Sequence, residues 1–381
     1  MYIESVPNRQ SPPCILLRED HREGSKVVKK TLANLTKWPT HVVEGLRVLI
    51  KGGSVAELDE DSFAIARSLP HGHVAAVLSV LKRLGLHQLI ASRSSSKRDL
   101  VVAMIVARII DPQSKLATAR GFRQETLFSS LAQECRLGSL DEDDLYEAMD
   151  WLLDRQCRIE DKLASRHLQQ GTFVLYDLTS TWYEGRTCSL AKLGHPRDKR
   201  KEEQIRAEAA LDGFYVVRTS VTAECISPEN AVATYKRLSV VERAFRCMKT
   251  VDMKVRPIFH RLEKRVRAHI FLCTLAYYVE WEMRQLWAPI LFDDEDHELA
   301  QPQRTSVVAP AERSAKAKRK AASKRTDDGM PVHSFRTLLK DLATITKNQI
   351  QPNIPDSPAF AKIALPTRTQ TKALDLLNVK L

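Results

Sequence analysis

Residues 173–185 read FVLYDLTSTWYEG, an apolar run with the acid Asp177 inside it. In a strand, side chains alternate between the two faces, so Asp177 would share a face with Leu175 and Thr179. An isolated carboxylate among apolar side chains costs free energy unless something compensates its charge. Mg²⁺ is an effective compensator, because it takes one or two carboxylates and completes its shell with water and phosphate oxygens. A hydrogen bond to Thr179 or Thr181 is the ordinary alternative, and the spacing alone favours it.

Residues 235–249 read YKRLSVVERAFRCMK and predict a basic amphipathic helix that carries one acid. Positions seven apart lie almost in line on a helix, so Tyr235, Glu242 and Lys249 share one face. An apolar stripe lies beside this face and consists of Leu238, Val241, Phe245 and Met248. From the border of this stripe Glu242 could reach a metal ion while Arg246 and Lys249 contact phosphate. An (i, i+4) pair between Glu242 and Arg246 on a solvated face explains the spacing equally well.

The charge balance favours a polyanionic partner. The 381 residues include 59 Lys and Arg against 47 Asp and Glu, a net charge of +12. Such an excess most often serves nucleic acid, although some basic proteins do not bind it. The seven cysteines contain no Cys-x-x-Cys pair, which argues against a zinc site or a disulfide framework and predicts reduced thiols in a cytosolic protein. We expect no membrane association, because the chain starts without a secretory signal pattern and its most apolar stretch, residues 268–279, is too short to span a bilayer.

Hydrophobic periodicity divides the chain into five segments. Residues 1–60 are expected to form a β-hairpin, over residues 14–35, and a helix. Residues 61–170 show helical periodicity, with one helix ending at Pro112 and another capped near Ser114. Residues 171–292 begin with strand-like runs and return to long helices over 228–287. Residues 293–333 read as a basic flexible linker, and residues 334–381 as a tail with two modest helices.

The two quoted stretches resemble the DDE transposases of bacterial insertion sequences, in the group with a Tyr, Glu and Lys signature around the last acid. The runs LAKLG at 190–194 and VRPIFHR at 255–261 are also similar to that family. Leu238 stands where the family has an Arg, with Arg237 beside it. The resemblance covers nearly the whole chain outside one gap.

The resemblance implies an α/β fold of large α content, with a helical N-terminal region that recognises DNA ends and a ribonuclease-H-like core. It implies that Asp177 and Glu242 are catalytic metal ligands for Mg²⁺ or Mn²⁺. It further implies that the partner is double-stranded terminal-repeat DNA, which intact relatives cut and transfer. The implied location is the bacterial cytoplasm. The residues expected to contact DNA are Tyr235, Arg237, Arg246, Lys249, Lys254 and Arg256.

The family's second acid is missing. Only 65 positions separate Asp177 from Glu242, too few for the strands that carry it. Asp198 lies in a polar, basic loop, and Asp212 forms an Asp-Gly turn, so neither replaces it. The interpretation is an internal deletion near residues 198–203 that removed the middle strands. We expect DNA binding without efficient cleavage.

Three alternatives stay open. Activity could survive through an unrecognised second acid. The chain could instead be a non-catalytic regulator that occupies element ends, as a homo-oligomer or mixed with intact transposase. It could also be a relic that folds poorly.

Overall fold

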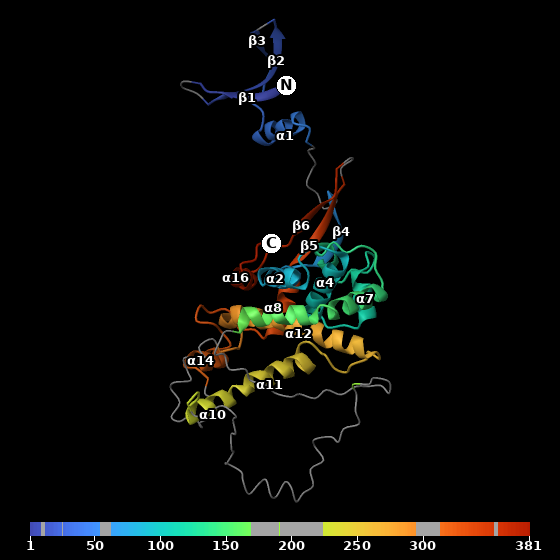
Figure 1. Ribbon diagram of the computed structural model, residues 1–381. Coiled ribbons are helices and arrows are strands. Elements are labelled where there is room, and N and C mark those ends of the chain that lie inside the picture. The colour runs from blue at the N-terminus through green and yellow to red at the C-terminus, as the bar shows by residue number, and fades with distance from the viewer. Residues whose placement is uncertain are drawn as a thin grey trace, which may run out of the picture. The chain divides into compact units, whose positions relative to one another are not determined.

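The computed structural model describes residues 1–8, 12–24, 26–53, 62–168, 190, 224–294, 313–353 and 357–381 (Figure 1). The chain forms two compact units. The first comprises Met1–Arg67 and Asn348–Lys362, and the second comprises Ser68–Lys347 and Ile363–Leu381. Each unit is therefore described by itself.

The first unit contains an antiparallel sheet of β1 (Tyr2–Val6), β2 (Cys14–Glu23) and β3 (Lys26–Asn34). This sheet confirms the hairpin predicted over residues 14–35. Strand β2 extends to Glu23, and the chain turns at Gly24, whose φ of 63° suits a residue without a Cβ. Opposite charges pair across the strands, with Arg18 Nη1 2.7 Å and Lys29 Nζ 3.3 Å from the Glu4 carboxylate. Helix α1 (Thr40–Ile50) follows the sheet.

A second three-stranded sheet was not predicted. Its strands are β4 (Phe63–Pro70), β5 (Thr346–Pro352) and β6 (Phe360–Ile363), in the order β4-β5-β6. Residues 61–170 were expected to be helical and 334–381 to form a tail with two modest helices. The helices are present, and β4, β5 and β6 are strands that neither expectation included. The strand that pairs with β4 is β5, which lies far away in the sequence, and local periodicity cannot reveal such a partner.

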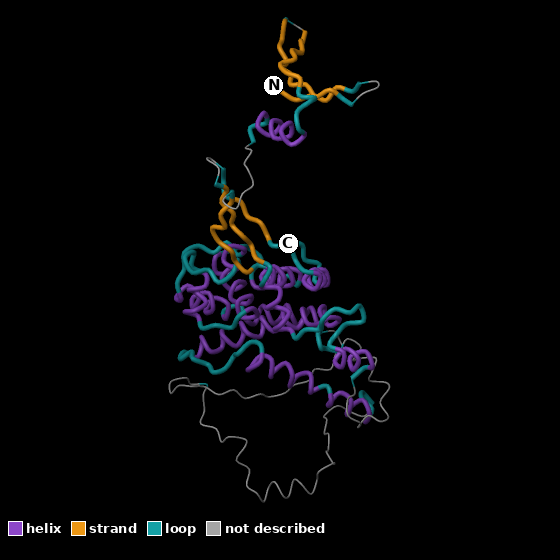
Figure 2. Tube along the Cα trace, turned by 180° about the vertical axis from the view of Figure 1, so that it is seen from behind, coloured by secondary structure: helices purple, strands orange, loops and turns teal. Residues whose placement is uncertain are grey.

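The second unit is a layered helical body (Figures 1 and 2). Its first half consists of α2 (Gly72–Arg83), α3 (Leu86–Ile90), α4 (Ser96–Ile110), α5 (Lys115–Phe122), α6 (Leu131–Glu134), α7 (Glu142–Leu153) and α8 (Gln156–His167). These helices confirm the predicted helical signal. The predicted cap is also present, because Ser114 Oγ accepts a hydrogen bond from Ala117 N at 3.2 Å, and Pro112 follows the end of α4.

Helix α12 (Glu263–Trp287) is the central element of this unit. It packs against α2, α4 and α7, and also against α16 (Arg368–Leu376). Trp287 is fully buried and donates its indole N–H to the Ala373 carbonyl at 2.9 Å. Helix α15 (Phe335–Ala343) packs on α2, where Gly72 allows a close approach, since a Cβ there would lie 2.5 Å from the Leu342 carbonyl oxygen. The described parts of the predicted segments 61–170, 171–292 and 334–381 thus share one hydrophobic core.

The remaining helices are α10 (Pro228–Lys236), α11 (Leu238–Arg246), the π-helical turn η1 (Cys247–Val251), the short 3₁₀ turn η2 (Ala288–Ile290) and α14 (Ala315–Ser323). Helix α14 corrects the predicted flexible linker over its own range. Its Lys320 is buried and donates from Nζ to the carbonyls of Ala288 and Asp293, at 2.7 and 2.8 Å. Burying the aliphatic stem while bonding the ammonium to two carbonyls ties a lysine-rich segment to the end of α12.

The expected ribonuclease-H-like strands around Asp177 fall in residues 169–223, which lie outside the described residues except for Leu190. The described residues 224–294 form helices, turns and isolated bridges. The architecture is therefore α/β with large helical content and two small sheets, as far as the described residues extend.

Candidate nucleic-acid interface

A long basic stretch of the described chain runs from Lys236 to Arg267 and is called the basic segment below. It holds eleven Lys and Arg against three acids, Glu242, Asp252 and Glu263. Seven of the cationic residues are exposed: Arg237, Arg243, Arg246, Lys254, Arg261, Lys264 and Arg267. All six residues expected to contact DNA lie in this segment or, for Tyr235, directly before it.

The helix that carries Glu242 is interrupted rather than continuous. Helix α10 ends at Lys236, α11 begins at Leu238, and η1 replaces the last turn of the predicted helix. Because a π-helical turn closes on residue i+5, it shifts the register that would align Lys249 with Glu242. Tyr235, Arg237, Glu242 and Arg246 are exposed, whereas Lys249 is half-buried. The prediction of one shared face for Tyr235, Glu242 and Lys249 therefore does not hold across the η1 turn.

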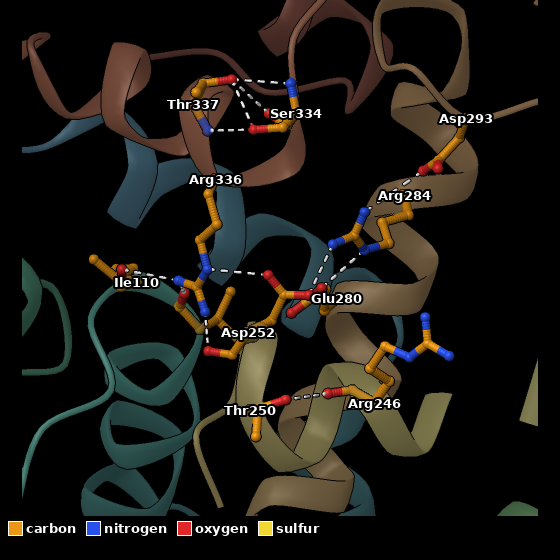
Figure 3. A network of polar contacts seen from close by, with 11 residues as sticks. Ile110, Arg246, Thr250, Asp252, Glu280, Arg284, Asp293, Ser334, Arg336 and Thr337 are labelled. Atoms are coloured by element: carbon orange, nitrogen blue, oxygen red, sulfur yellow. Dashed lines mark hydrogen bonds and ion pairs between the residues drawn. The ribbon is translucent and has the colours of Figure 1, made fainter. Parts of the chain in front are cut away.

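A buried charge network fixes the chain directly after η1 (Figure 3). Asp252 is 1% exposed, and two arginines pair with its carboxylate. Arg284 Nη2 of α12 lies 3.0 Å from Asp252 Oδ2, and Arg336 Nε of α15 lies 3.2 Å from Oδ1. Arg336 also donates to the Asp252 carbonyl, and its Nη1 donates to the Ile109 carbonyl at 2.6 Å. The start of the loop is thus tied to α4, α12 and α15 at once.

Hydrogen bonds to backbone atoms hold the rest of this loop, from Met253 to Arg256. Arg108 Nη1 donates to the Met253 carbonyl at 3.4 Å, and His269 Nε2 donates to the Val255 carbonyl at 3.3 Å. The Val255 and Arg256 amides donate to the carbonyls of Met248 and Lys249, at 3.0 and 3.3 Å. Such a chain of bonds gives the loop one conformation rather than many.

Burial then alternates along the loop. Met253, Val255 and Ile258 are buried in the core, while Lys254 and Phe259 are exposed and Arg256 is half-buried. The apolar side chains keep this loop on the body, while Lys254 between them is exposed and Arg256 is half-buried. This arrangement suits contact with phosphates, which needs cationic side chains on a fixed backbone.

The expected magnesium site is not contained in the described residues. Asp177 lies outside them, and Glu242 is an exposed carboxylate on α11. Among the residues described, one group of three or more potential ligands could share a metal ion, and it consists of Cys247, Asp252 and Glu280 rather than Glu242. Mg²⁺ prefers oxygen ligands to a thiol, and both carboxylates of this group are already paired with arginine. We therefore derive no metal-dependent step.

Burial of this group instead determines the protonation of Glu280 and Cys247. Glu280 is fully buried, and its Oε1 accepts from Arg284 Nε at 2.8 Å. Burial raises the pKa of Glu280 to about 7, Arg284 opposes that rise and the Asp252 carboxylate adds to it. Burial and then Asp252 raise the pKa of the Cys247 thiol to about 12, so this thiol stays protonated at neutral pH.

Beneath the loop lie basic side chains that the sequence did not single out. Lys115 at the start of α5 is buried, and burial, followed by the charge of Arg108, lowers its pKa to about 7. Burial lowers the pKa of His260 to about 4 and that of His269 well below its usual value, so both rings are neutral at pH 7. No local pattern marks Lys115 as buried, because its helix places it against α12 only in the folded chain.

None of the helices within the described ranges combines the length and apolar composition that a bilayer-spanning helix needs. Comparison of the chain with protein-family models, with curated proteins and with solved structures finds no match in any of the three.

Proposed function

We propose that this chain is a DNA-binding protein derived from a DDE transposase of a bacterial insertion sequence, and that it binds double-stranded DNA of the element ends without cutting it efficiently. The observation that carries the proposal is the basic segment, whose cationic side chains are held on a loop fixed by Asp252, Arg284 and Arg336. A rigid row of cations neutralises phosphates without first losing conformational freedom.

The sequence resemblance supports the transposase origin. It rests on the residues around Asp177 and Glu242 and on the run VRPIFHR at 255–261. That last run forms part of the anchored loop, in which Arg256 and Arg261 alternate with the buried Val255 and Ile258. The resemblance and the basic surface therefore point to the same stretch of chain.

Weak or absent cleavage follows from the missing second acid. Loss of a carboxylate that binds the metal directly removes most of metal-assisted phosphodiester chemistry. Cleavage that survived through another acid would appear as nicking of supercoiled plasmid with Mg²⁺ or Mn²⁺. Nicking by the wild-type chain that Asp177→Ala abolishes would contradict the proposed inactivity.

Binding is tested by selection from a pool of randomised duplexes, followed by titration of the selected duplex at several salt concentrations. End recognition predicts that the selection enriches one sequence motif. It also predicts that log affinity falls by about 0.9 per log unit of salt concentration for each phosphate that the protein neutralises. Enrichment of no motif would contradict end recognition, and the absence of any salt-dependent binding would contradict DNA binding altogether.

A further inference from the structure

The loop of the basic segment presents an aromatic ring to solvent. Phe259 is 71% exposed, while both of its neighbours turn inward. Ile258 is buried in the core, and the His260 ring packs 4.9 Å from the His269 ring and 6.0 Å from the Tyr146 ring, measured between centroids. Because the residues on both sides are fixed inside, the outward position of Phe259 is built into the fold.

An exposed phenyl ring on a fixed loop leaves apolar surface in water that a bound partner could cover. Burial of a Phe side chain stabilises a fold, and this ring forgoes most of that gain. Single exposed apolar residues are common on proteins, so exposure alone identifies no partner. The charges beside Phe259 provide the second observation.

The chain is cationic on both sides of Phe259 in the sequence. Lys254 and Arg256 precede Phe259, and Arg261 and Lys264 follow it. The nearest acids in sequence are already paired, Asp252 with Arg284 and Arg336, and Glu263 with Arg267 at 3.0 Å. An aromatic ring among cations matches the surfaces that bind single-stranded nucleic acid, where bases stack on rings and cations follow the phosphates.

We propose that Phe259 stacks against an unpaired base of bound nucleic acid, so that the basic segment, which binds duplex through its cations, also binds single-stranded or locally opened DNA. This inference rests on the proposed DNA binding and adds the form of DNA that the loop accepts. A paired base keeps its faces inside the duplex stack and cannot offer one to the ring. A base in a single strand or at an opened end can do so.

The experiment compares the affinity of the full chain for a fluorescein-labelled single-stranded oligonucleotide and for the same sequence as duplex. Phe259→Ala should weaken single-strand binding roughly 5- to 150-fold, the range that stacking supplies, and change duplex binding by less than about twofold. Phe259→Trp should keep single-strand affinity, because a larger ring stacks at least as well. Leu262→Ala is the matched control, since Leu262 is also exposed and apolar but has no ring; it should change neither affinity.

Unchanged single-strand affinity in Phe259→Ala would overturn the inference, and so would an equal loss for both forms of DNA. A changed oligomeric state of Phe259→Ala with unchanged DNA affinity would assign the ring to a protein contact and also overturn it. Salt-dependent duplex binding by the wild-type chain would leave the proposed function standing in each of these cases. A wild-type chain that binds neither form would instead refute the proposed function itself.

Discussion

Arg336 Nε lies 3.2 Å from Asp252 Oδ1, which joins α15 to the turn after η1 across 84 positions of sequence. The same guanidinium bonds the Asp252 carbonyl and the carbonyl at the end of α4. One side chain from the C-terminal part thus holds the loop of the basic segment. The conformation of the loop in the basic segment therefore depends on α15. The sequence alone had assigned these two parts to separate segments, 171–292 and 334–381.

Replacing Arg336 by Gln should lower the free energy of unfolding by about 3 kcal/mol, because it leaves the buried Asp252 with Arg284 as its remaining partner. Urea denaturation measures the change. Arg267→Gln is the control, since Arg267 pairs with Glu263 on an exposed surface, and it should cost less than about 1 kcal/mol. Equal costs for the two variants would show that the Asp252 network does not stabilise the fold as described.

The pKa of Glu280 predicts a pH dependence of stability. Its folded-state pKa of about 7 lies above the ordinary value of 4.5, so folding favours the protonated carboxyl. The stability that this group contributes therefore falls as pH rises from about 4.5 to about 7. Cys247, Asp252, Tyr277, Arg284, Asp293 and Arg336 are the other charged or titratable groups of this network.

Glu280→Gln imitates the protonated form and should remove this fall, which amounts to about 3 kcal/mol at most. Urea denaturation of both proteins at pH 5 and pH 8 measures it. Glu282→Gln on the same helix is the control, because Glu282 is only partly buried and pairs with Arg83 at 3.8 Å. A difference between wild type and Glu280→Gln that stays constant with pH would contradict the assignment.

Lys115 should destabilise the fold at neutral pH. Its folded-state pKa of about 7 lies below the ordinary value of 10.5. The cost of burying the charged ammonium is therefore complete below about pH 7 and disappears as pH rises towards 10.5. Lys115→Met should therefore raise the free energy of unfolding at pH 6, by up to about 5 kcal/mol, with a smaller gain at pH 10.

Thermal or urea unfolding at the two pH values tests this, with Lys97→Met as the control. Lys97 is exposed and pairs with Glu147 at 3.4 Å, so its replacement should change stability by less than about 1 kcal/mol. A Lys115→Met variant less stable than wild type at pH 6 would mean that the ammonium has a favourable partner in the folded protein.

Local sequence patterns predicted those elements whose formation depends on residues close together in the sequence. The hairpin over residues 14–35, the Ser114 cap and the buried helix around residues 268–279 follow from alternation, capping and periodicity within short windows. The basic character of the segment around Arg246 was equally visible, because charge is a property of composition.

What the sequence missed depends on contacts between distant positions. Strand β4 pairs within a sheet whose other strands start at Thr346 and Phe360, so no local window contains its partners. The anchoring of Asp252 by Arg336 and the burial of Lys115 have the same origin. The π-helical turn η1 broke the expected seven-residue register at Lys249, and simple helical periodicity does not predict such a turn.

The central claim is that the anchored loop contacts DNA phosphates, and a salt titration of duplex binding tests it most directly. The double variant Lys254→Gln with Arg256→Gln is compared with Lys340→Gln and Lys372→Gln, which removes the same charge from exposed positions on α15 and α16. The account predicts that the first variant lowers the slope of log affinity against log salt by about 2, whereas the second leaves it unchanged. Equal slopes for both variants would contradict the claim that this loop is the DNA-binding surface.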